Sequence, residues 1–235
     1  MAKDYNLVLT GRNIPKLQKL QEELKENNPW RYEICTLDYS IKSSIADFKS
    51  YLMRSVPSLT GIVLITPRPS FYGKALFHDE DVWLEALQTT FTGPLEALKA
   101  ALPQLTQNSK IVVIAGTTAV QVQPEFGPVC VIRRMWTTYT KALSHQLGPQ
   151  GIRINAISPG IVLTNFQQEK IRSKSQENGI SYDLQMEQDV AKIPLRRHAQ
   201  PKELAQAIKF LISDESDFIN GINLVFDGGI TVSYQ

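Results

Sequence analysis

Short apolar runs alternate with amphipathic helical segments along most of the chain, and this alternation limits the folds that are open to it. An apolar run without polar alternation is typical of a strand that is buried on both faces, as in a parallel sheet. Such runs predict six strands, at 5–10, 31–37, 61–66, 110–115, 153–158 and 222–226. Apolar residues at helical spacing predict helices at 13–27, 43–53, 79–102, 129–148 and 203–213. The pattern therefore predicts an α/β fold, with helices on both faces of a mostly parallel sheet.

Composition places the chain among ordinary globular proteins and excludes several functions. With 235 residues, 43% hydrophobic and 20% charged, it suits a single folded domain over 1–235. The 25 basic and 23 acidic residues give a net charge of +2 without a basic run, so we expect no nucleic-acid partner. Cys35 and Cys130 are too few for a zinc site, so we expect no metal. Because no apolar stretch is long enough to span a membrane and no signal peptide is visible, we expect no membrane association and a cytoplasmic location.

The segment 165–192 differs from its surroundings because it is polar and has few apolar anchors. A long stretch of this kind inside a compact domain is more often a mobile covering element than part of the core. We therefore expect a mobile lid at 165–192 within the single domain.

The C-terminal half holds two long and specific sequence motifs. They read GIRINAISPGIVLT over 151–164 and IPLRRHAQPKELAQAIKFLISDESDFINGINLVFDGG over 193–229. Both resemble the short-chain dehydrogenase/reductase family, and NLVLTGRNIPKLQKL, TLDYS and GIVLIT resemble that family's second, third and fourth strands. The resemblance therefore extends over nearly the whole chain. It implies a doubly wound Rossmann-like sheet and, in the family, oxidoreductase chemistry with a nicotinamide cofactor.

Near its N-terminal end the chain departs from the family pattern. The family opens with a strand, a T-G-x-x-x-G-x-G turn that binds the cofactor pyrophosphate, and a helix. The sequence here starts at what resembles the second strand, and Thr10-Gly11 is followed by Arg12-Asn13 without a further glycine, as in an ordinary strand-to-helix turn. Lacking the first strand-turn-helix unit, the remaining strands are expected to close together into one sheet of about six strands in the order 2-1-3-4-5-6.

The family's four catalytic positions carry other residues in this chain. The resemblance places the asparagine, serine, tyrosine and lysine positions at Thr90, Gly116, Val129 and Arg133. Valine cannot donate a proton, glycine offers no side chain to a carbonyl oxygen, and the pKa of arginine is too high for proton transfer at neutral pH. Thr117 is an alternative source of the serine hydroxyl if the end of the strand is shifted. We therefore expect that none of the family's catalytic residues is retained.

Several positions that the family uses for its cofactor keep suitable residues. The resemblance implies that Arg12 binds the 2′-phosphate of NADP, Asp38 the adenine, and Thr164 the nicotinamide amide or the pyrophosphate. Weaker candidates lie beside these: Asn13, Pro159 and Gly160. Arg12, Asp38 and Thr164 also have local interpretations, as a solvated charge, a strand-end cap and a helix N-cap. Since adenosine contacts bind poorly without a pyrophosphate site, we expect no cofactor, or NADP(H) if any.

Three arginines are expected around the position of the family's active site: Arg68, Arg133 and Arg134. Clustered guanidinium groups suit the recognition of a carboxylate or a phosphate, so the pocket is predicted to bind an anionic small molecule. Salt bridges to acidic residues across the pocket are an equally good interpretation of the same cluster.

These observations lead to three competing functions. The leading interpretation is a member of the family that has lost dehydrogenase activity and acts as a non-catalytic subunit. It would assemble through the helices at 79–102 and 129–148, as a homo- or hetero-oligomer and possibly with an active paralogue. The second is an NAD(P)-dependent oxidoreductase of the ketoreductase or alcohol dehydrogenase type. The third is a non-redox cyclase, isomerase or lyase that acts on an anionic biosynthetic intermediate.

Overall fold

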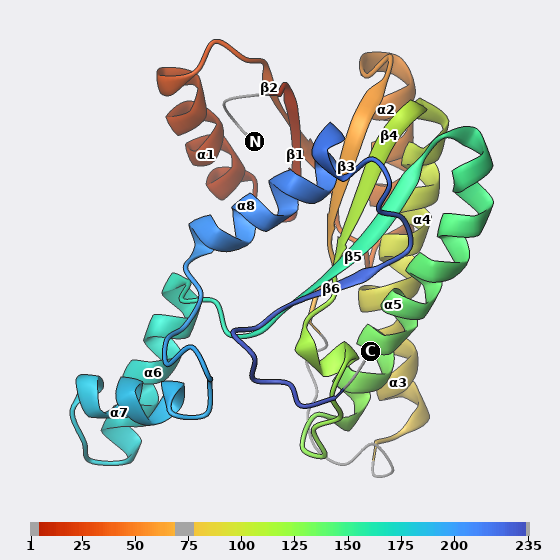
Figure 1. Cartoon of the computed structure of the whole chain (residues 1–235). Coiled ribbons are helices and arrows are strands. Elements are labelled where there is room, and N and C mark those ends of the chain that lie inside the picture. The colour runs from red at the N-terminus through yellow and green to blue at the C-terminus, as the bar shows by residue number, and fades with distance from the viewer. Residues whose placement is uncertain (1–4, 69–77, 234–235) are drawn as a thin grey trace.

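The computed structural model of the chain describes residues 5–68 and 78–233. The strands in this part are β1 (Leu7–Gly11), β2 (Tyr32–Thr36), β3 (Leu59–Ile65), β4 (Leu105–Ile114), β5 (Arg153–Pro159) and β6 (Asn223–Phe226). The α-helices are α1 (Ile14–Asn27), α2 (Lys42–Ser55), α3 (Glu80–Leu87), α4 (Gly93–Ala101), α5 (Gly127–Leu147), α6 (Asn165–Glu177), α7 (Tyr182–Val190) and α8 (Pro201–Ile212). Strands and helices alternate through most of this order, as the sequence pattern predicts (Figure 1).

All paired strands run parallel. Strands β3, β4, β5 and β6 form a four-stranded sheet in that order, and β1 and β2 form a separate pair. Helices α2, α4 and α5 cover one face, and α8 lies across the other, as Figure 1 shows. The predicted fold class is therefore confirmed: an α/β, Rossmann-like arrangement of parallel strands with helices on both faces.

The prediction that the sheet closes in the order 2-1-3-4-5-6 is wrong at one point, because β1 is not hydrogen-bonded to β3. The two strands nevertheless pack on the same helices. Val8 of β1 and Ile62 of β3 belong to one hydrophobic cluster with Leu52 of α2 and Ala97 of α4. Since protein interiors are closely packed, β1 cannot slide against β3 without losing these contacts. Helices α2 and α4 therefore hold β1 and β3 in place, and the two strands remain in separate sheets.

The single helix that is expected at 79–102, with a kink at Gly93-Pro94, is interrupted just before that point. A π-helical turn over Gln88–Thr92 joins α3 to α4. Pro94 has no backbone N–H, so the carbonyl oxygen of Thr90 has no partner one turn further along the helix. The indole Nε1 of Trp136, on α5, donates to this carbonyl at 2.8 Å. The proline therefore frees a carbonyl group, and a buried side chain of a neighbouring helix satisfies it.

The segment 165–192, expected as a lid, folds into α6 and α7. Each helix has a side-chain N-cap, in which Thr164 and Ser181 accept hydrogen bonds from the backbone. Ile171 and Gln185 are fully buried, so the segment has more internal anchors than its polar composition indicates. Its mobility stays a prediction. Nowhere in residues 5–68 and 78–233 is there a helix with the length and apolar character needed to cross a membrane.

Candidate functional site

The carboxyl ends of β3, β4 and β5 lie at one edge of the four-stranded sheet, because these strands pair in parallel. In open α/β sheets, ligands bind at this edge. Strand β4 is the central one of the three, and it leads into Gly116 and a short 3-10 turn, η4 (Thr117–Ala119). The residues around η4 are therefore the first place to look for a site.

Gly116 occupies a backbone conformation that is essentially restricted to glycine. Its φ of 111° and ψ of 157° would cost another residue about 1–3 kcal/mol. An added Cβ would also lie 2.9 Å from Cζ of Arg133, and closer still to one terminal guanidinium nitrogen. The arginine side chain thus fills the space that a serine side chain would need here. The structure brings together two of the predicted positions, Gly116 and Arg133.

Arg133 lies on α5 and is half-buried against η4. Its Nη1 donates to Oγ1 of Thr118 at 3.4 Å, so the hydroxyl of Thr118 lies beside the guanidinium. The alternative that Thr117 supplies the serine hydroxyl stays a prediction. Val129, one turn earlier on the same helix, is 1% exposed. The site therefore offers a permanent positive charge with hydrogen-bond donors but no acid that titrates near neutral pH.

Thr90 is buried, and its hydroxyl does not face an open site. Oγ1 donates to the carbonyl oxygen of Ala86 at 2.6 Å, within its own helix. The main-chain carbonyl oxygen of Thr90 accepts the hydrogen bond from the indole of Trp136 that was described with the fold. Trp136 is a residue whose role the sequence analysis did not identify. The sequence signal that could have found its role is Pro94, which leaves the carbonyl four residues earlier without a helical donor.

The three arginines of the predicted anionic pocket differ in their contacts. Arg133 lies over Gly116, as described. Arg134 is exposed, and its Nη1 donates to the carbonyl oxygen of Ala119 at 3.2 Å, so it ties α5 to η4. Arg68 lies over the ring of Phe126 with its Cζ 5.6 Å from the ring centroid, next to the start of α5. Of the three, Arg133 is the one whose guanidinium packs at the end of β4 itself.

The residues expected at the adenosine end lie after β1 and β2. Arg12 is exposed, and Asn13 caps α1 by accepting from Lys16 N at 3.0 Å. Asp38 turns toward its own loop, where its Oδ1 accepts from the backbone and the hydroxyl of Ser40. These bonds lower the pKa of Asp38, and the nearby charge of Arg12 lowers it further. Arg12 therefore has a guanidinium available at the surface, while Asp38 and Asn13 serve local structure.

The residues expected at the nicotinamide end follow β5. An added Cβ on Gly160 would lie 3.0 Å from Cα and Cβ of Asp227, so the turn after Pro159 passes close to the end of β6. The backbone N–H of Gly160 donates to Phe226 at 2.9 Å. Thr164 is exposed, and its Oγ1 accepts from Gln167 N at 3.3 Å as the N-cap of α6. Sequence reasoning named this cap as the local alternative.

A nicotinamide coenzyme fits the two ends of this edge but not its middle. Arg12 could hold a 2′-phosphate, and the turn at Gly160 could lie beside a nicotinamide ring. At Gly11, however, an added Cβ would meet only Leu17, at an ordinary 3.7 Å, so no close approach of a phosphate requires this glycine. The Asn13 side chain also takes a backbone N–H at the start of α1. Among the described residues, nothing cradles a pyrophosphate.

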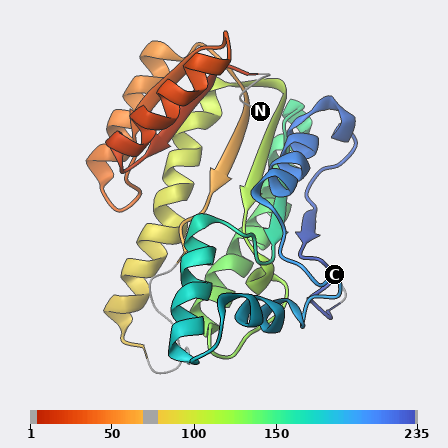
Figure 2. The same ribbon diagram turned by 90° about the vertical axis from the view of Figure 1, so that its left-hand side faces the viewer.

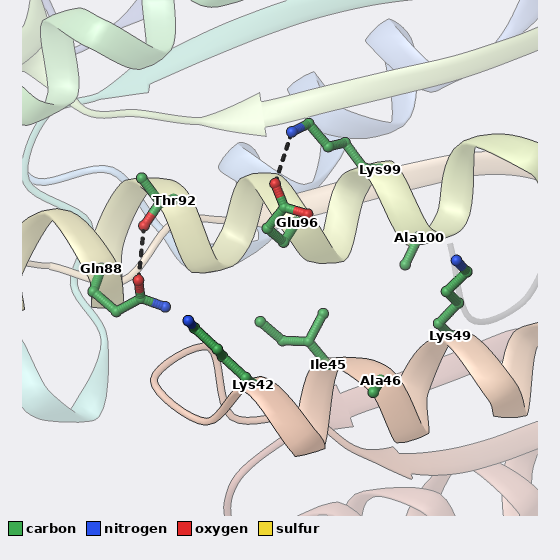
Figure 3. A pocket seen from close by; sticks show the side chains of 9 residues that line it. All are labelled: Lys42, Ile45, Ala46, Lys49, Gln88, Thr92, Glu96, Lys99 and Ala100. Atoms are coloured by element: carbon green, nitrogen blue, oxygen red, sulfur yellow. Dashed lines mark hydrogen bonds and ion pairs between the residues drawn. The ribbon is translucent and has the colours of Figure 1, made fainter.

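A second hollow lies away from this edge, between α2 and α4. It has a volume of about 460 Å³ and is lined by Lys42, Ile45, Ala46, Lys49, Gln88, Thr92, Glu96, Lys99 and Ala100. Figure 3 shows Lys42 pointing toward Gln88, while Lys99 turns back to Glu96 on its own helix at 2.7 Å. None of the residues predicted for catalysis or cofactor binding is among those that line it. This hollow is separate from the Arg133 site.

Beside α6 and α7 lies a buried polar cluster that sequence reasoning did not find. Gln185 donates to Asp189 at 2.9 Å and accepts from Asn178 at 2.7 Å. His198 is 3% exposed, and within the described part of the chain neither of its ring nitrogens has a hydrogen-bond partner. Burial lowers the pKa of His198, and the charge of Asp189 opposes that shift. Burial therefore favours the neutral form of the imidazole, and its two ring nitrogens have no hydrogen-bond partner among the described residues.

Comparison with known proteins connects this geometry with a family. The sequence pattern of the family described as enoyl-(acyl carrier protein) reductase matches residues 1–231. Isoepoxydon dehydrogenase patN of Penicillium expansum is 34% identical over 159 residues, which are 65% of this chain and 58% of that protein. The chain spans 54–58% of the length of the curated relatives compared with it.

Two solved structures show the same fold. L-Sorbose reductase from Gluconobacter frateurii, complexed with NADPH and L-sorbose, gives a TM-score of 0.91 at 20% identity, covering 99% of this chain and 90% of that one. An NADPH-bound short-chain oxidoreductase from Pseudomonas aeruginosa PAO1, described as containing an atypical catalytic center, gives 0.84 at 22% identity, covering 97% and 88%. With the match over residues 1–231, these likenesses establish that the chain belongs to the short-chain dehydrogenase/reductase family.

Proposed function

We propose that this chain is the substrate-binding part of an NADPH-dependent reductase that acts on the carbonyl group of a small anionic substrate. The solved relatives support the choice of a reductase over a non-catalytic subunit, since those named above are complexes with NADPH. One of them combines NADPH with a catalytic center that its description calls atypical. A departure from the usual catalytic residues is therefore compatible with coenzyme binding in a protein of this fold.

The placement of Arg133 over Gly116 carries the proposal. Gly116 has no side chain, so a substrate oxygen can approach the guanidinium from the carboxyl end of β4. A charged guanidinium binds a carbonyl or carboxylate oxygen with charge-assisted hydrogen bonds. Thr118 accepts from Nη1 and so restrains the orientation of the group. Arg133 would bind and polarise the substrate, and Val129 cannot supply the proton, which therefore comes from water or from the substrate's own groups.

The coenzyme supplies hydride chemistry when it is bound. This chain contributes the exposed Arg12 as a contact for the 2′-phosphate, which distinguishes NADPH from NADH. Because the described residues do not cradle a pyrophosphate, we assign to this chain only substrate binding and the anchoring of the two coenzyme ends.

The test compares two neighbouring arginines on α5. Binding of a panel of 2-oxo acids is measured by calorimetry for the wild-type chain, Arg133→Met and Arg134→Met. Arg133→Met is expected to weaken binding at least about tenfold, or about 1.4 kcal/mol. Arg134→Met should leave binding unchanged, because that guanidinium contacts the carbonyl oxygen of Ala119. Equal losses in both variants, or no oxo-acid binding by the wild-type chain, would refute the role of Arg133.

The non-catalytic subunit remains the competing proposal, and one observation favours it. Leu84 on α3 and Val131 on α5 are large apolar residues with about half of their surface exposed, on the two helices expected to mediate assembly. Co-purification with an active reductase, together with no oxidation of NADPH at any concentration of oxo acid, would favour this reading. A non-redox lyase or isomerase would instead convert an anionic substrate without NADPH, and it would require Arg133.

A further inference from the structure

The hollow between α2 and α4 has the size of a binding site. Its volume of about 460 Å³ is within the range of about 300–1,000 Å³ that is typical of small-molecule sites. Figures 1 and 2 show α2 next to α4, and Figure 3 shows the side chains that line the hollow between them. The residues assigned to the Arg133 site do not line it, so the proposed function leaves the hollow without a role.

Part of the lining of the hollow is apolar. Ala100 of α4 is buried in the cluster where α2 packs against α4, and Ile45 of α2 packs against the same cluster. Ala46 also lines the hollow from α2. Since alanine carries only a methyl group, the two alanines leave space between the helices. An apolar lining of this kind suits the hydrocarbon part of a ligand.

The charges of the lining do not balance. The lining contains three lysines and one carboxylate: Lys42, Lys49, Lys99 and Glu96. Lys99 donates to Glu96 on its own helix at 2.7 Å, so these two charges compensate each other. Lys42 and Lys49 form no ion pair or side-chain hydrogen bond with any residue of 5–68 and 78–233. Two positive charges of the hollow are therefore available to an anionic ligand.

The spacing of Lys42 and Lys49 suits two separate anionic groups. The two lysines are seven residues apart on α2, so they lie on one face of the helix, about 10 Å apart along its axis. Ile45 lies between them on that face. A ligand that contacts both ammonium groups is therefore elongated, with an anionic group at each end and an apolar part beside Ile45.

Two hydrogen-bond donors face one another at the Lys42 end of the hollow. Thr92 Oγ1 donates to Oε1 of Gln88 at 3.2 Å, so the amide oxygen is directed along its own helix. The amide nitrogen of Gln88 is then directed toward the ammonium group of Lys42, as Figure 3 shows. Neither group satisfies the other, because both only donate. A carboxylate between them, which only accepts, would satisfy both.

The π-helical turn over Gln88–Thr92 fixes the position of this amide. The backbone N–H of Gly93 donates to the carbonyl oxygen of Gln88, and Trp136 donates to that of Thr90. Turns of this kind are frequent at functional sites. Because the amide is held in place before a ligand arrives, the entropy cost of binding is lower.

We propose that the hollow between α2 and α4 binds a linear dicarboxylate with an apolar chain. One carboxylate accepts hydrogen bonds from Lys42 and from the amide of Gln88. The chain lies along Ile45 and Ala100, and the second carboxylate pairs with Lys49. This site is independent of the proposed reductase, since the two share no residue.

The experiment measures by calorimetry how defined probes bind to the full chain. The main probe is suberate, in which a hydrocarbon chain separates two carboxylates. Octanoate has the same chain length but a single carboxylate, and in succinate the two carboxylates are close together. The measurement is made at about 0.01 M ionic strength, where charges are weakly screened. Suberate is expected to bind at least about tenfold more tightly than octanoate or succinate.

Substitutions in the hollow should have distinct effects. Lys49→Met is expected to reduce the affinity for suberate to that for octanoate, because one ammonium group remains. Lys42→Met should reduce it at least about tenfold, and Gln88→Met by a smaller factor, because the amide carries no charge. The matched control is Lys25→Met, since Lys25 is an exposed lysine of α1 that has no ion pair with a described residue. This variant should bind suberate as the wild-type chain does, and thermal unfolding checks that each variant is folded.

Several outcomes would overturn the proposal. They include no binding of suberate at about 1 mM and equal affinities for suberate and octanoate. Equal losses in Lys25→Met and Lys42→Met would show that only the net charge of the chain matters. A loss of suberate binding in Arg133→Met would place the dicarboxylate at the end of β4 instead. The proposed reductase fails or stands separately, because its binding of 2-oxo acids depends on Arg133 and not on Lys42.

Discussion

Replacing Gly116 with alanine tests whether Arg133 has taken over the space of the family's serine. The backbone conformation of Gly116 costs any other residue about 1–3 kcal/mol. The new Cβ would also lie 2.9 Å from Cζ of Arg133 and displace the guanidinium from Thr118. We therefore expect Gly116→Ala to lower the free energy of unfolding by about 2–3 kcal/mol, of which about 1 kcal/mol depends on the presence of Arg133.

The assay is a double-mutant cycle in urea, with Gly116→Ala, Arg133→Ala and the double variant. For a urea dependence of about 2 kcal/mol per molar, a loss of 2 kcal/mol moves the midpoint by about 1 M. Gly179→Ala is the matched control, since Gly179 also has a positive φ but an added Cβ there meets nothing within 4 Å. Effects of Gly116→Ala and Arg133→Ala that add within about 0.3 kcal/mol would refute the packing argument.

Three further substitutions test other features. His198→Phe should stabilise the fold, and more at about pH 5 than at about pH 8, because burial lowers the pKa of His198 and the unfolded chain takes up the proton first as the pH falls. Equal stabilisation at both values in thermal unfolding would contradict this. Trp136→Phe should lower the free energy of unfolding in urea by about 1–3 kcal/mol, because it leaves the buried carbonyl of Thr90 without a donor. A change below about 0.5 kcal/mol would indicate that water replaces the indole as the donor. Glu203→Gln removes a carboxylate whose pKa the Arg197 side chain lowers to about 2. The ionised Glu203 stabilises the fold above pH 4.5, its ordinary pKa, and this stabilisation is lost as the pH falls toward 2. The free energy of unfolding of the variant should therefore lack this decrease between pH 4.5 and pH 2.

Much of the fold could be predicted from local patterns. Mostly apolar runs predicted the place of each described strand, since a strand covered on both faces is rich in apolar residues. Caps are equally local, because Asn13 and Thr164 accept from backbone N–H groups a few residues away. The cap at Thr164 could therefore be named from the sequence as an alternative to a ligand contact. The helix predicted at 79–102 is interrupted by a π-helical turn just before Gly93-Pro94, where proline leaves a preceding carbonyl without a helical donor.

Contacts between distant segments could not be predicted in the same way. Sequence spacing placed Gly116 and Arg133 at two positions of one family pattern. It could not show that the guanidinium of Arg133 occupies the space that a side chain at position 116 would fill. Thr118 rather than Thr117 meets that guanidinium because η4 turns between them. The polar composition of α6 and α7 gave no sign of their buried residues. Gln185 is an example, because its burial is accompanied by side-chain hydrogen bonds and not by apolar character.

The order of apolar runs and turns was enough, without coordinates, to predict parallel strands between two layers of helices, which the structure confirms. The loss of the family's proton donor at Val129 stays a prediction. Whether β1 and β3 would pair with each other was decided by tertiary packing alone. Local patterns specify which residues are extended, but the distance between two strands depends on the side chains beneath them. Here Val8 and Ile62 pack against one cluster that includes residues of α2 and α4, yet β1 and β3 do not pair in the described part of the chain.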